Sequence, residues 1–130
     1  MINPFQAGDT KSYNKVIEEK DTATFDSGEV HPVYATFALG RDAEWACRLF
    51  ALEMKEHDEE GIGTYLHVDH HAPALIGETV RFEAELLRVN GNEVICSYTA
   101  RVDNRLIASG ETGQKILKKT RLEQLFRNLS

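Results

Sequence analysis

The stretch FALGRDAEWACRLFALEMKE, residues 37–56, decides the fold of this chain. Apolar residues recur in it three and four positions apart, which predicts one helix of about five to six turns. The residues that carry this spacing are Ala43, Ala46, Cys47, Phe50, Ala51 and Met54. An acidic run follows at 56–60, and acidic side chains at a helix C-terminus oppose the helix dipole. We therefore expect the helix to stop near His57 and the acidic run to lie in a solvated loop.

After the helix the sequence alternates with a period of two, which predicts consecutive strands. The four segments are residues 62–72, 79–89, 93–102 and 105–117. Asn90-Gly91 is a strong hairpin signal and Asp103-Asn104 a weaker one, so the last three strands should pair antiparallel. Before the helix, residues 11–26 are interpreted as a strand pair or one bent strand.

These elements predict a single α+β domain over residues 1–130, with a short C-terminal helix at about 119–129. One long central helix must be wrapped by a five- to six-stranded antiparallel sheet to bury its apolar face, which is the hotdog arrangement. Such a sheet has free edges, and an exposed edge strand invites pairing with a second copy. We expect a homodimer, or a higher assembly built from it. The C-terminal helix should pack on the domain or on a partner subunit.

Composition limits the possible partners and compartments. Apolar residues make up 42% of the chain, enough to bury a core, and 15 basic against 21 acidic residues argue against nucleic acid or an anionic membrane as a partner. The two cysteines, Cys47 and Cys96, show neither metal-binding nor redox spacing. With no apolar segment long enough to span a membrane and no export signal, we expect a soluble, cytoplasmic protein.

Glu44 interrupts the helix stripe and is flanked by small residues. It is either a solvated helix glutamate or a carboxylate in an apolar crevice, where burial would raise its pKa toward values useful for a general base. Thr36, eight residues earlier, is either an N-cap or a second member of the same cleft. Gly40 between them would let a substrate approach the helix backbone closely.

The segment 67–71, HVDHH, contains three of the five histidines. Strand alternation puts His67 and His71 on one face, about 13 Å apart, too far to share one metal ion. Leu66, Val68 and His70 share the other, apolar face, so His70 is either a core histidine or a histidine that points toward Glu44. Gly61 and Gly63 permit a tight loop whose N–H groups could face a ligand.

The run VYATFALGRDAEWAC at 33–47, followed by Gly63-Thr64 and then Val68-Asp69-His70, resembles the fluoroacetyl-CoA thioesterase family of hotdog proteins. The similarity extends from about residue 8 to 117. The resemblance implies that Thr36, Glu44 and His70 are the catalytic set, and that Gly63 is the glycine on the oxyanion side.

The resemblance also implies an activity. The chain would be a thioester hydrolase that cleaves a small or short-chain acyl-CoA to free acid and coenzyme A. Coenzyme A would be part of the substrate, with no resident cofactor and no metal. Two other functions remain open at this stage, namely an acyl-CoA hydratase or dehydratase and a non-catalytic acyl-CoA binding module.

Three positions depart from the family pattern. Val30 stands where the fluoroacetyl-specific enzyme has a bulky aromatic residue over the site. Thr112 and Gln114 stand where the resemblance leads us to expect a histidine and an arginine. These departures leave the identity of the acyl group undetermined.

Overall fold

A computed structural model describes residues 1–25 and 28–129 of the chain. The side chain of Val30 lies outside the part it describes. The elements in chain order are β1 (Thr10–Val16), the short 3-10 helix η1 (Glu19–Asp21), β2 (Thr22–Phe25), β3 (Gly28–Tyr34), α1 (Thr36–Met54), β4 (Glu59–His70), β5 (Thr79–Asn90), β6 (Glu93–Val102), β7 (Arg105–Lys118) and α2 (Lys119–Leu129).

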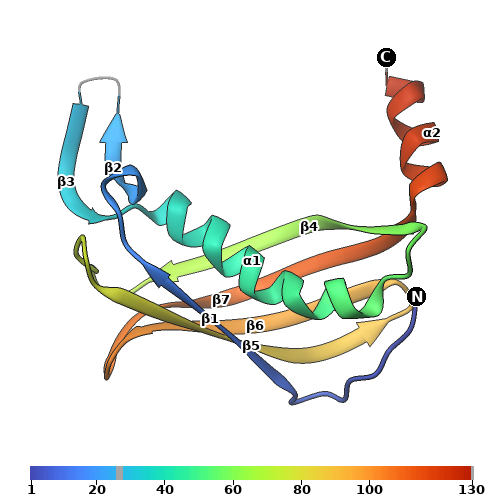
Figure 1. Cartoon of the computed structure of the whole chain (residues 1–130), viewed down its shortest axis with the longest axis horizontal. Helices are drawn as coiled ribbons and strands as arrows, with labels where there is room; N and C mark the ends of the chain where they lie inside the picture. Colours follow the sequence, from blue (N-terminus) through green and yellow to red (C-terminus); the bar gives the residue numbers. More distant parts are fainter. Residues whose placement is uncertain (26–27, 130) are drawn as a thin grey trace.

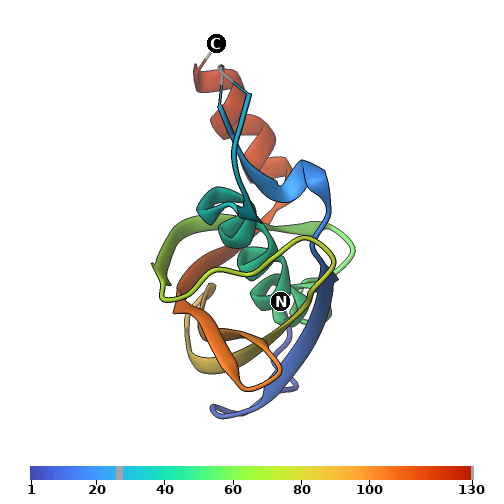
Figure 2. The same cartoon turned by 90° about the vertical axis from the view of Figure 1, so that its left-hand side faces the viewer.

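The main sheet has five antiparallel strands in the order β1-β5-β6-β7-β4, and it curves around α1 (Figures 1 and 2). β2 and β3 form a separate two-stranded hairpin that stands beside the N-terminus of α1. The turn glycine Gly91 has a φ of 64° and Asp103 a φ of 52°, the left-handed conformation that both predicted hairpins require. The hotdog fold is therefore confirmed.

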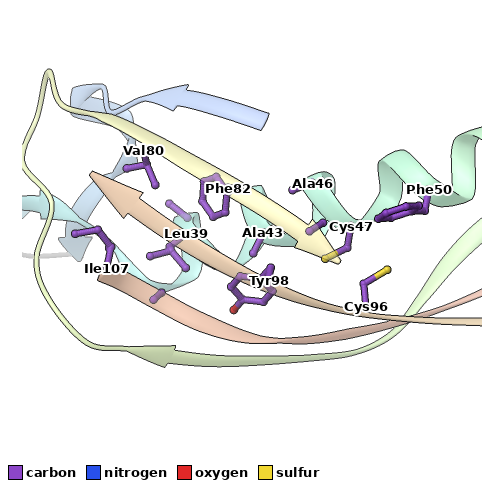
Figure 3. Close-up of a cluster of buried hydrophobic side chains, with 14 of the residues drawn as sticks. Leu39, Ala43, Ala46, Cys47, Phe50, Val80, Phe82, Cys96, Tyr98 and Ile107 are labelled. Atoms are coloured by element: carbon purple, nitrogen blue, oxygen red, sulfur yellow. The ribbon is translucent and has the colours of Figure 1, made fainter. Parts of the chain in front are cut away.

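The core lies between α1 and the concave face of the sheet. Leu39, Ala43, Cys47 and Phe50 follow one another along the buried face of the helix and meet β5, β6 and β7 (Figure 3). The periodicity that predicted α1 thus reports the face that it buries. Within the described residues, no helix is both long and apolar enough to cross a membrane.

The acidic run after α1 differs from expectation. The helix already ends at Met54, and β4 begins at Glu59, so Glu59 and Glu60 belong to a strand rather than to a solvated loop. Glu59 is buried because the N-terminal ammonium lies 2.6 Å from its carboxylate and because its strand position pairs with Lys118. Both partners are distant in sequence, which is why the local charge pattern pointed to solvent.

The N-terminal prediction also needs correction. Of the predicted segment 11–26, the described residues up to 25 contain two strands, but these do not pair with each other, because β1 joins the main sheet beside β5 while β2 pairs with β3. The 3-10 turn η1 separates β1 from β2 and redirects the chain. No strand was predicted at β3, which pairs with β2 through two register shifts.

Candidate active site

Thr36 and His70 meet at the N-terminal end of α1. Thr36 is the first residue of α1 and His70 the last of β4, and the Thr36 hydroxyl lies 2.9 Å from Nδ1 of His70. The N-cap of α1 is Ala35, whose side chain caps nothing, so Thr36 does not serve as the cap. Its hydroxyl is directed instead at the histidine, an arrangement in which the imidazole can accept the hydroxyl proton.

The surroundings of His70 keep its imidazole neutral. Burial lowers the pKa of His70 below its ordinary value of 6.5, and the neighbouring backbone of Ala72 opposes this only in part. Nε2 is buried and has no hydrogen-bond partner in the described part of the chain. A neutral imidazole with Nδ1 facing a hydroxyl is suited to act as a general base near pH 7.

A hollow of about 560 Å³ lies beside Thr36. It is lined mostly by apolar groups, namely Ala23, Ala35, Thr36, Phe37, Gly40, Leu66 and Val68. A Cβ on Gly40 would stand 3.0 Å from Cδ2 of Leu66, so a larger residue would crowd the floor of the hollow. The first N–H groups of a helix have no partner within it, and those of α1 border this hollow. They can stabilise negative charge on an oxygen atom placed there.

Glu44 lies elsewhere in the protomer. It is two turns beyond Thr36, about 12 Å along the helix axis. Its carboxylate lies against β4 at Gly63, so close that a Cβ on Gly63 would stand 2.6 Å from Oε1 of Glu44. In the described part of the chain no hydrogen bond joins Glu44 to Thr36 or His70. The structure therefore brings two of the three expected catalytic residues together and places the third beside Gly63.

The other histidines of the 67–71 segment have separate partners. Nε2 of His67 lies 3.0 Å from the Asp69 carboxylate, and Nε2 of His71 lies 2.8 Å from the Ser109 hydroxyl. Among residues 1–25 and 28–129, no three His, Cys, Asp or Glu side chains cluster as metal ligands would.

Thr112 and Gln114 are both buried on the sheet face that meets α1. Oγ1 of Thr112 and Oε1 of Gln114 have no hydrogen-bond partner among the described residues. Gln114 pairs in the sheet with Gly63, and Thr112 pairs with Leu66 and with Cys96. Close by, the side chains of Cys47 and Cys96 lie near each other between α1 and β6 (Figure 3).

Sequence analysis missed an ionic network beneath the N-terminus of α1. The Tyr34 hydroxyl donates to the Asp42 carboxylate, and Arg41 bridges Asp42 and the fully buried Asp21. Burial alone would raise the pKa of Asp21, but hydrogen bonds from the Glu18 backbone, Arg41 and the lysine on β1 bring it below its ordinary value. An aspartate among the buried helix positions was the one signal of this network in the sequence.

The fold and this site together define a class of protein. A five-stranded sheet wrapped around one helix, with a hydroxyl–imidazole pair at the helix N-terminus beside a small apolar hollow, is the arrangement of a hotdog thioester hydrolase. The model of the family described as the fluoroacetyl-CoA-specific thioesterase FlK matches residues 17–120. The chain belongs to this family, and the predicted resemblance is confirmed.

Solved structures agree with this assignment. A thioesterase superfamily member from Thermus thermophilus is 38% identical, with 98% of this chain and 95% of that chain covered and a TM-score of 0.93. A variant of FlK in which a phenylalanine is replaced by alanine is 25% identical to this chain. The match covers 97% of this chain and 98% of that chain, with a TM-score of 0.86. A hot-dog-like protein from Thermanaerovibrio acidaminovorans is 22% identical, with 95% and 92% covered and a TM-score of 0.86, and it shows the fold alone. No protein with curated annotation is significantly similar in sequence.

Proposed function

We propose that this protein hydrolyses a small or short-chain acyl-CoA thioester to the free acid and coenzyme A. The observation that carries the proposal is the hydrogen bond between Thr36 and the neutral His70, at the edge of an apolar hollow. The hollow is large enough for a small acyl group, and Thr36 is the one polar side chain among the described residues that line it. Two variants of FlK, to whose family the chain belongs, have been crystallised with ligands. One, with a phenylalanine replaced by alanine, holds fluoroacetate and coenzyme A, and the other, with a threonine replaced by serine, holds acetyl-CoA.

The chemistry follows from the positions of the groups. The thioester carbonyl carbon would lie beside the Thr36 hydroxyl, with its oxygen toward the free N–H groups of α1 and toward Gly63 of a second protomer. His70 takes the proton from Thr36, or from a water molecule in its place, as the new C–O bond forms. The C–S bond then breaks, and the thiolate of coenzyme A leaves and takes up the proton. When water is the nucleophile, the free acid forms in this step. When Thr36 is the nucleophile, a water molecule activated by His70 and by Glu44 of the second protomer then attacks the acyl-threonine ester, which releases the free acid and restores the Thr36 hydroxyl. Side chains and backbone supply every group, so the reaction needs neither a resident cofactor nor a metal.

The position of Glu44 supports a homodimer. β4 is an edge strand of the main sheet, and Ile62, Tyr65 and Leu66 along it remain exposed in the protomer. Antiparallel pairing of two β4 edges around a twofold axis would extend the sheet across both copies. The same axis can bring the Glu44 and Gly63 of one protomer to the Thr36 and His70 of the other.

The register of this pairing follows from the site. Residues directly opposite each other in an antiparallel pair point to the same face, so the axis must pass through a residue of β4 rather than between two. When it passes through His67, the extra residue at the register shift between Gly63 and Tyr65 brings Gly63 of one copy opposite His70 of the other. Each active site then combines Thr36 and His70 of one protomer with Glu44 and Gly63 of its partner. Gly40, which lies over Leu66 and Val68, is near the axis in both copies. Coenzyme A would extend along this interface.

The unpaired cysteines fit a reducing, cytoplasmic compartment.

A panel of acyl-CoA substrates tests the proposal, with release of free coenzyme A followed by a thiol reagent. We expect turnover of acetyl-CoA and related short acyl chains. The Thr36→Ala, Glu44→Ala and His70→Ala variants should each lose two or more orders of magnitude in kcat/KM while remaining folded. Tight binding of coenzyme A without turnover on any member of the panel would contradict the proposal.

A further inference from the structure

The C-terminal helix α2 carries an apolar stripe that its own protomer leaves uncovered. Leu122, Leu125, Phe126 and Leu129 recur at three- and four-residue spacing on one face of α2. Leu122 is buried against the domain, but Leu125, Phe126 and Leu129 are 41%, 58% and 84% exposed. Figures 1 and 2 show α2 standing away from the sheet and from α1. An amphipathic helix of this kind lacks the surface that its outer apolar residues should cover.

A second apolar patch lies at the opposite end of β4. The loop at 71–78, which follows His70, presents Leu75 and Ile76 with 50% and 44% of their surface exposed. α2 starts at the other end of the same strand, where the Lys119 amide donates to the Asp58 carbonyl and Lys118 pairs with Glu59. Within one protomer the whole length of β4 therefore separates the two patches (Figure 1).

The twofold pairing proposed above would bring these two patches together. The axis that places Gly63 opposite His70 of the partner exchanges the two ends of β4, so the end at Glu59 lies beside the end at His70 of the partner. α2 begins beside Glu59, and the loop with Leu75 and Ile76 follows His70. The two patches are therefore neighbours across the dimer, although neither lies on the paired strands themselves.

We infer that α2 of each protomer packs Leu125, Phe126 and Leu129 against Leu75 and Ile76 of a second copy of this chain. The inference rests on the proposed function, because the register comes from assembling the active site. Each α2 thus acts as an arm that extends the β4 interface beyond the end of the strand.

The charges around the two patches are complementary. Lys119 and Arg121 on the first turn of α2 are exposed. Glu19 is exposed beside the loop at 71–78, to which its segment is tied by the hydrogen bond from the Gly77 amide to the Ile17 carbonyl, whereas Glu18 next to it already pairs with Lys15 and Lys20. Opposite charges at the rim of an interface favour the correct pairing more than they add affinity.

This contact would also brace the active site. The loop at 71–78 holds the residues before α1, because the Tyr34 amide donates to the Ala74 carbonyl at 2.8 Å and Val33 forms a bridge with Leu75. The loop begins directly after His70. The arm of the partner would therefore press on the segment that connects His70 to the chain leading into Thr36.

Cross-linking tests the contact directly. Two differently tagged chains, one carrying Phe126→Cys and the other Ile76→Cys, are co-expressed, purified through both tags and treated with a short bismaleimide. We expect a covalent dimer that contains both tags. The matched control replaces Phe126→Cys by Leu52→Cys, an exposed position on α1, and should give no such dimer. Equal yields from the two pairs would overturn the inference.

Sedimentation gives an independent readout. We expect Phe126→Asp to weaken dimerisation about tenfold or more, since a large apolar side chain would lose its cover. Gln124→Asp, on the polar face of the same helix, should leave the dimer unchanged. If the two variants have equal dissociation constants while the wild-type chain hydrolyses acyl-CoA, the role of α2 is refuted and the proposed function is not. A wild-type chain that hydrolyses no acyl-CoA would refute the proposed function instead.

Discussion

Replacing Gly63 by alanine should impair hydrolysis through Glu44 while leaving the fold intact. The new Cβ would stand 2.6 Å from Oε1 and 3.4 Å from Cδ of Glu44. Ordinary contacts begin at 3.4 Å, so the carboxylate oxygen must retreat by about 0.8 Å. A catalytic group displaced by roughly that much can cost up to about a hundredfold in rate. We expect kcat/KM to fall about tenfold to a hundredfold.

The stability of the same variant should change little. The Glu44 carboxylate is the flexible end of a half-buried side chain, so it can move at low cost. Alanine is also acceptable in a strand. We expect the free energy of unfolding from urea denaturation to change by less than about 1 kcal/mol. A loss of stability as large as the loss of activity would mean that Gly63 acts on the fold rather than on Glu44.

Gly61 provides a matched control two residues earlier, on the same face of β4. A Cβ at Gly61 would meet Nη1 of Arg48 at 3.3 Å, and its next nearest neighbours, in Ala51 and Gln114, would both lie at 3.6 Å. Gly61→Ala should therefore keep nearly full activity in the same acyl-CoA assay. If Gly63→Ala hydrolyses its substrate as fast as Gly61→Ala, the placement of Glu44 in the catalytic machinery is wrong.

Three further predictions concern other parts of the molecule. Burial lowers the pKa of His70 below 6.5, and only the neutral imidazole accepts a proton. In a pH–rate profile, kcat/KM should therefore stay constant as the pH falls from 8 to 6.5 and decline only at lower pH. A decline that begins above pH 7 would contradict this. Tyr34→Phe removes a hydrogen bond to the buried Asp42, although Asp42 keeps its ion pair with Arg41. The free energy of unfolding from urea denaturation should therefore fall by about 1 to 2 kcal/mol, and an unchanged value would refute the role of this contact. Cys96→Ala should leave kcat/KM unchanged, since the thiol is buried in the core. Loss of turnover in a folded variant would show that Cys96 takes part in the reaction.

The helix and the long hairpins could be predicted because their signals are local. The spacing within 37–56 marks the buried face of α1, and Asn90-Gly91 supplies the left-handed conformation that its turn needs. The β2–β3 hairpin gave no such signal, because β2 has only four residues and the pairing of the two strands shifts register twice. Glu59 was misplaced because its partners come from both ends of the chain.

The site could be predicted only in part for a similar reason. Strand alternation selected His70, and the structure places it at 2.9 Å from Thr36. The separation of Glu44 from this pair follows from helix geometry. In the proposed dimer the Glu44 of a second copy completes the site, and no pattern within one chain specifies how two strand edges pair. The charged network around Asp42 was equally invisible, since its members come from three separate segments.

The central claim is an acyl-CoA thioesterase whose site is shared between two protomers, and complementation tests it most directly. Chains carrying His70→Ala and chains carrying Glu44→Ala, each inactive alone, are mixed and allowed to exchange subunits. In a mixed dimer one site then has Thr36 and His70 from one chain and Glu44 from the other, all intact. With random exchange, hydrolysis should recover to about a quarter of the wild-type rate. If the mixture stays as inactive as its two components, the three residues do not act across the dimer.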